Sequence, residues 1–119
     1  MADRVLVWYI PGVLSENVQG VNVSTEFVLD DDYIPKRVLL KQKEAQSGDA
    51  TIIDINDDGT SIFSLRPAIN QGLLETEWDV FDSTITRLEK DSVITLDVDQ
   101  VSGTTPGKSL TVQLELDRV

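Results

Sequence analysis

The chain has 119 residues, of which 40% are hydrophobic, and carries 21 acidic against 10 basic residues, for a net charge of −11. This length fits a single domain with its own core, expected over residues 1–119, and the absence of cysteine excludes a disulfide framework. The acidic balance disfavours binding to nucleic acid and to anionic membranes. Without histidine, the usual general base and most zinc sites are missing, so we expect no catalytic residues and no cofactor.

Residues 4–10 form the first predicted strand, and it is apolar on both of its faces. Such a strand is buried on both sides or covered by another chain, because an exposed apolar edge promotes aggregation. We therefore expect it to dock on a partner or on a neighbouring copy. The expected interface residues are Val5, Val7, Trp8 and Tyr9, although a place in the core remains open for Trp8 and Tyr9. The apolar run is also shorter than that of a signal peptide or a membrane span.

A polar segment over residues 13–25 follows, and it predicts a loop or a short strand around Val21 and Val23. Residues 26–29 form a weak strand that ends at three consecutive acids, Asp30 to Asp32. Three acids in a row are typical of a solvated turn.

Residues 34–43 (IPKRVLLKQK) alternate as a strand, with Ile34, Val38 and Leu40 expected on one face. The basic residues of this segment, which we call the basic stripe, are Lys36, Arg37, Lys41 and Lys43. One interpretation is a contact with an acidic partner or a neighbouring copy. The favoured alternative is that the stripe balances acidic strands beside it.

The clearest local signal is a hairpin over residues 50–64 (ATIIDINDDGTSIFS), because Asp58-Gly59 stands between two apolar runs. Ile53 and Ile55 are expected to face the core and Ile52 the opposite side. We place this hairpin at the centre of an antiparallel β fold.

The same stretch contains a partial calcium motif. Asp54, Asn56 and Asp58 followed by Gly59 match the first half of an EF-hand loop. The match fails at the twelfth position, where Leu65 replaces the bidentate glutamate, and the flanks are strand-like. We therefore expect no metal site and favour a hairpin turn rich in aspartate and asparagine, with calcium as the alternative.

The rest of the chain predicts a long connection and three further strands. Trp78 and Phe81 suit a short helical or irregular segment that closes the end of a sandwich. Strands are expected over residues 84–88, 92–101 and 108–116. Together these elements predict an all-β fold, an antiparallel β-sandwich of seven or eight strands with jelly-roll or Greek-key connections. A barrel is the alternative.

Five segments form a pattern that covers roughly residues 50–116, namely residues 51–56, 59–63, 91–101 (DSVITLDVDQV), 103–107 (GTTPG) and 110–114. In this pattern the last seventy residues resemble a β-sandwich domain that recurs in virion structural proteins of tailed bacteriophages. One departure is Lys90, where the pattern has a glycine before the aspartate. Such domains are similar to those of capsid decoration (cement) proteins and of tail or head fibres.

The resemblance implies a non-enzymatic structural role in the virion. A compact chain without repeats suits a decoration protein that stabilises the phage head better than it suits a fibre. The implied partners are the major capsid protein and further copies of this chain, as a dimer or trimer. The implied place is the capsid surface, after synthesis in the host cytoplasm. The alternative is a tail- or fibre-associated module that binds carbohydrate or a receptor through Trp78, Tyr33 or loop residues.

Overall fold

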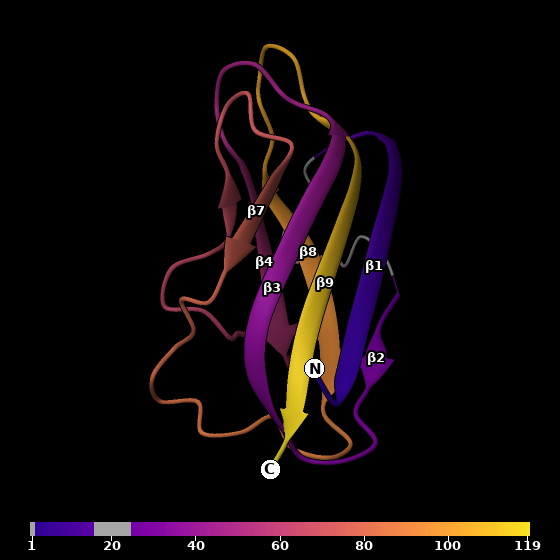
Figure 1. The fold of residues 1–119 in the computed structure, drawn as a ribbon, viewed down its shortest axis with the longest axis vertical. Helices are drawn as coiled ribbons and strands as arrows, with labels where there is room; N and C mark the ends of the chain where they lie inside the picture. Colours follow the sequence, from indigo (N-terminus) through magenta and orange to yellow (C-terminus); the bar gives the residue numbers. More distant parts are fainter. Residues whose placement is uncertain (1, 16–24) are drawn as a thin grey trace.

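The structure, a computed structural model, describes residues 2–15 and 25–119. Over these residues it contains strands and turns only, and the strands form two antiparallel sheets packed face to face (Figure 1). The predicted β-sandwich is therefore confirmed, and the described residues form nine strands in place of the seven or eight expected. The chain changes sheets at almost every connection, so strands adjacent in sequence are seldom adjacent in a sheet.

The four-stranded sheet has the order β1-β9-β3-β7 and lies toward the viewer in Figure 1. Its members are β1 (Arg4–Val13), β9 (Lys108–Arg118), β3 (Tyr33–Glu44) and β7 (Glu75–Trp78). The long strands β9 and β3 form its centre, and β1 and β7 are its two edges. Residues of β9 alternate as predicted, because Leu110, Val112 and Leu114 are fully buried.

The second sheet has the order β2-β8-β4-β5, and β6 pairs with the beginning of β4. Its members are β2 (Phe27–Val28), β8 (Val93–Gln100), β4 (Thr51–Asp57), β5 (Thr60–Ser61) and β6 (Ala68–Ile69). The predicted hairpin turn is confirmed, because Asp58 and Gly59 both have positive φ, 48° and 87°, as a two-residue type I′ turn requires. The arm after the turn is only two residues long.

The inner faces of the two sheets share one hydrophobic core. Its members come from both sheets and from the loops at the two ends of the sandwich, where Leu14, Leu29 and Leu88 are fully buried. Ile53 and Ile55 are buried with them, as predicted. Phe63 belongs to this core, and its ring stacks on that of the partly buried Phe81 with centroids 5.3 Å apart.

The acidic turn Asp30 to Asp32 forms ion pairs with arginines from three other segments. Asp30 pairs with Arg4 of β1, Asp31 with Arg118 of β9, and Asp32 with Arg87 of the loop before β8. The Tyr33 hydroxyl also donates to Asp30 Oδ1 at 2.7 Å, and this hydrogen bond lowers the pKa of Asp30. The turn therefore connects both sheets at this end of the molecule.

Several local predictions were wrong. Residues 84–88 form turns and a single bridge at Leu88, and Trp78 ends a strand and does not belong to a helical segment. Ile34 is 44% exposed, because a register shift between Pro35 and Arg37 moves it to the outer face. Proline lacks an amide hydrogen, which explains why the ladder is interrupted there. The short strand considered around Val21 and Val23 lies outside the described residues.

Candidate functional site

The outer face of the four-stranded sheet is the candidate site. It brings together the apolar side chains of β1 and the basic stripe of β3, which lie some thirty residues apart in the sequence. The register places its side chains in three rows that cross the strands. Since side chains alternate between the faces of a strand, residues two apart on each strand share this face. The rows are Val5–Glu115–Arg37, Val7–Gln113–Leu39–Glu77 and Tyr9–Thr111–Lys41–Glu75.

The edge strand β1 contributes an apolar strip to this face. Val5, Val7 and Tyr9 are 45%, 45% and 48% exposed, which places all three among the exposed large hydrophobic residues. The strand pairs with β9 along one side, and within the described ranges no strand pairs with its other side. This strip, Val5, Val7 and Tyr9, is called the β1 strip below.

Trp8 lies on the opposite face of β1 and is 1% exposed. Its ring packs edge-on against Phe27, with centroids 5.1 Å apart, and its indole N–H donates to the carbonyl oxygen of Thr25 at 2.6 Å. The expectation that Trp8 belongs to an interface is therefore wrong for this chain, because its ring is buried in the core and its N–H group is already hydrogen-bonded.

Arg37 of the basic stripe is held by two carboxylates of the neighbouring strands. Its guanidinium pairs with Glu115 of β9 and, at 2.7 Å, with Glu77 of β7. The hydrogen bond to Glu115, followed by the one to Glu77, raises the pKa of Arg37. For Arg37, the structure agrees with the favoured interpretation, in which the stripe balances the charge of acidic residues on the neighbouring strands.

The three lysines of the stripe behave differently from Arg37. Lys36, Lys41 and Lys43 are exposed, and within the described part of the chain none of them forms an ion pair. Lys36 occupies the register shift beside Pro35, whereas Lys41 lies in the row of Tyr9. The lysines therefore remain available as charges for a partner.

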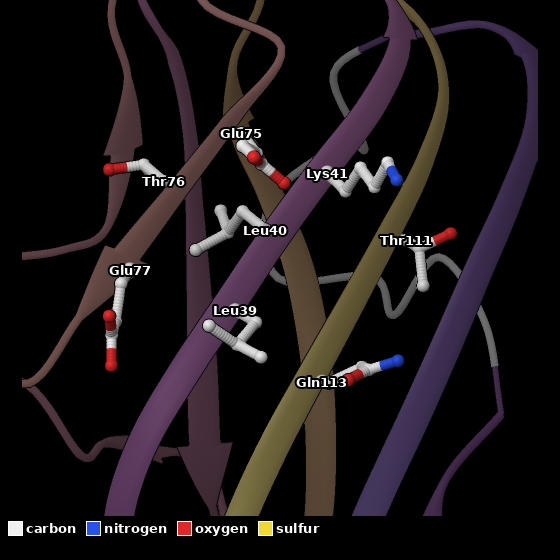
Figure 2. A pocket seen from close by; sticks show the side chains of 8 residues that line it. All are labelled: Leu39, Leu40, Lys41, Glu75, Thr76, Glu77, Thr111 and Gln113. Carbon is white, nitrogen blue, oxygen red and sulfur yellow. The ribbon is translucent and has the colours of Figure 1, made fainter.

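A hollow of about 570 Å³ opens on this face between β7, β3 and β9. Figure 2 shows Lys41 extending from β3 toward β9, with Glu75 and Glu77 on the adjacent strand β7. Although Lys41 and Glu75 are register partners, they form no ion pair. The hollow thus presents an amine on one side and carboxylates on the other, with Thr111 and Gln113 as hydrogen-bonding groups.

The residues of the calcium alternative lie on and beside β4 but do not converge. Asp54 accepts a hydrogen bond from the Ser61 hydroxyl at 2.5 Å, and the Asn56 amide donates to Asp97 at 2.7 Å. Asp58 Oδ1 accepts from the backbone N–H of Val93 at 2.8 Å. Among the described residues, no group of three or more acidic side chains could hold a metal ion.

The aromatic residues of the carbohydrate alternative do not form an open platform. Tyr33 is 1% exposed, and the half-buried Trp78 donates its indole N–H to the carbonyl oxygen of Leu65 at 2.9 Å. Tyr9 is the aromatic side chain that the outer face presents, in line with Thr111 and Lys41. Sequence reasoning found Tyr9 but missed Leu39, Gln113 and Glu77, since only strand pairing brings these residues together.

Comparisons with protein-family models, curated proteins and solved structures find no match to this chain. A search of the described segments for a helix long and apolar enough to cross a bilayer also finds none.

Proposed function

We propose that this chain is a virion structural protein that decorates a bacteriophage capsid, and that the outer face of its four-stranded sheet contacts the major capsid protein. The observation that supports this is the union of the β1 strip with the lysine side chains of β3 on one sheet face. The sequence resemblance to decoration and fibre domains adds the virion context.

The outer face has the chemistry of a protein-binding surface. Exposed apolar side chains such as Val7 and Tyr9 lie beside charged residues, and tyrosine is among the residues that contribute most to interface energies. The hollow next to Lys41 offers both signs of charge to a protruding side chain of the partner. Such an arrangement favours a protein partner with a complementary surface over a small substrate.

The net charge of −11 indicates the electrostatic character of the partner. A basic patch on the capsid shell would attract the molecule as a whole and accelerate its docking. Glu75 and Glu77 at the β7 edge would meet that patch, whereas Lys41 would select an acidic side chain within it.

The proposal is tested by a cryo-EM map of the particle that carries this protein, together with a binding assay on capsids that lack it. We expect density for the sandwich on the head. Lys41→Glu should weaken capsid binding by roughly fivefold to tenfold. Lys90→Glu, which reverses an exposed charge in a turn at one end of the sandwich, should leave binding unchanged. If the map places the protein on the tail, or shows none of it on the particle, the proposal is wrong.

The alternative role as a tail- or fibre-associated carbohydrate module predicts different behaviour. Binding on a glycan array that is lost in Tyr9→Ala would favour it, because Tyr9 is the exposed aromatic ring of the outer face. If the protein binds no glycan on the array but binds capsids, the result would favour the decoration role.

A further inference from the structure

The edge strands of the two sheets are not protected to the same degree. Exposed edges of native proteins are usually kept short, charged or covered, because they can pair with other chains. The edges β2, β5 and β6 are two residues long, and β7 has four residues, of which two are glutamates. In contrast, β1 is ten residues long and, in the described part of the chain, has no strand on its outer side.

The charge distribution identifies what can approach this edge. β1 contains no acidic residue, although the chain has 21, and its single charged side chain, Arg4, is paired with Asp30. Two molecules that each carry −11 repel each other over most of their surface, and β1 adds no acidic side chain to that repulsion. The outward side chains of the strand are apolar, so two copies of the edge are complementary to each other.

We infer that β1 pairs with β1 of a second copy, antiparallel and about a two-fold axis at Val7. The ladder between β1 and β9 is regular from Arg4 to Ile10, and Val7 is the middle of that segment. Beyond it the register shifts, and Pro11 cannot donate a ladder hydrogen bond. The pairing sets Val7 against Val7 of the second copy, and Val5 against Tyr9.

This register keeps outward side chains opposite outward side chains and joins the two four-stranded sheets into one of eight strands. The β1 strip then lies in the middle of the joined face and not at its border. Each row of the joined face ends on charged residues at both sides, as in an interface with an apolar centre and a polar rim. Only the use of the joined face rests on the proposed function, since this face is the one that would contact the capsid.

A pair of strand edges buries little surface, so the dimer is held mainly by backbone hydrogen bonds and three apolar side-chain pairs. We expect a dissociation constant on the order of micromolar, as for small interfaces. The association is therefore measured by sedimentation velocity at high micromolar concentration.

Val7→Asp is the first test, because the two introduced carboxylates would lie directly opposite each other. We expect the unchanged chain to sediment as a dimer and Val7→Asp as a folded monomer. Val28→Asp is the matched control, since Val28 is 58% exposed on β2, an edge of the other sheet. A monomeric unchanged chain, or equal behaviour of the two variants, would overturn the inference.

Thiol cross-linking tests the register, since the chain has no cysteine of its own. Opposite Cβ atoms in paired strands lie roughly 4.5–5.5 Å apart, within reach of a short thiol–thiol cross-linker. Val7→Cys should cross-link alone, whereas Val5→Cys should cross-link only when mixed with Tyr9→Cys. Cross-linking of Val5→Cys alone, without that preference, would contradict the assigned register.

The two proposals fail in different ways. If the unchanged chain is monomeric but binds capsids, the pairing of β1 is wrong and the decoration role stands. If the dimer forms and the capsids bind nothing, the pairing stands and the decoration role is wrong.

Discussion

Asp54 of β4 and Asp97 of β8 lie directly opposite each other on the outer face of the second sheet. Asp97 is 7% exposed and accepts a hydrogen bond from the Asn56 amide, and Asp54 accepts one from the Ser61 hydroxyl. Two neighbouring carboxylates are thus held by side-chain hydrogen bonds on a face that alternation alone would assign to water. Burial makes the charged form of Asp54 unfavourable there, which lowers the free energy of unfolding at neutral pH.

Asp54→Asn should stabilise the protein at neutral pH. Burial raises the pKa of the Asp54 carboxyl above 3.8, a shift that the Ser61 hydrogen bond opposes and the charge of Asp99 increases. Between 3.8 and the raised value the folded state binds more protons than the unfolded state, so stability falls as pH rises through that window. Asparagine removes this loss and still accepts the hydrogen bond from Ser61.

The measurement is the melting temperature across the acidic and neutral range. At pH 7 we expect Asp54→Asn to melt a few degrees higher than the unchanged chain, with the difference disappearing as pH falls toward 3.8. Asp49→Asn, in an exposed loop, serves as the control. A melting temperature at pH 7 equal to or below that of the unchanged chain would contradict the assignment.

Trp8 and Val7 are adjacent but should respond to truncation very differently. Trp8→Ala removes a fully buried ring and should cost about 3–5 kcal/mol of unfolding free energy. Val7→Ala trims a half-exposed side chain and should stay within about 0.5 kcal/mol. Urea unfolding of the two variants at low concentration measures both values. Similar losses would mean that β1 does not separate a core face from a surface face.

Arg37→Met should destabilise through Glu115. The Glu115 side chain is 12% exposed and pairs with Arg37, so the substitution leaves a poorly solvated carboxylate without its cation. We expect a measurable loss of unfolding free energy, because a poorly solvated carboxylate loses its charged hydrogen-bond partner. The double variant Arg37→Met with Glu115→Gln should recover most of the loss. If the double variant is as unstable as the single one, the lost packing of the arginine stem is responsible.

Gly59→Ala should weaken the β4–β5 turn. Gly59 has a φ of 87°, which an alanine adopts only at a cost of roughly 1–2 kcal/mol. No atom would obstruct the added methyl group, so the effect isolates backbone conformation. Gly103→Ala is the control, because its φ is ordinary and its surroundings are equally open. Thermal unfolding should show a clear loss for Gly59→Ala and little change for Gly103→Ala.

Much of the fold was predictable because local patterns are strong. Alternation identified the inward residues of β8 and β9, and Asp58-Gly59 identified the turn. Residues 84–88 have the β-branched residues and the leucine of a strand, but Ile85 packs against the core from a loop and Leu88 forms only a single bridge with Tyr33. Ile34 was wrongly predicted to face inward for another reason, since a register shift is not visible in a hydrophobic pattern.

By itself, the sequence determined the sandwich, its hairpin and the strongly acidic balance, because period-two alternation, turn residues and charge are properties of neighbouring or summed residues. It could not say which face of β1 is buried, because Leu6 and Trp8 are as apolar as Val5 and Val7. Only the tertiary structure decided that, and only strand register placed Tyr9, Thr111, Lys41 and Glu75 in one row. The physical reason is that the pairing of strands distant in the chain depends on how the whole core packs.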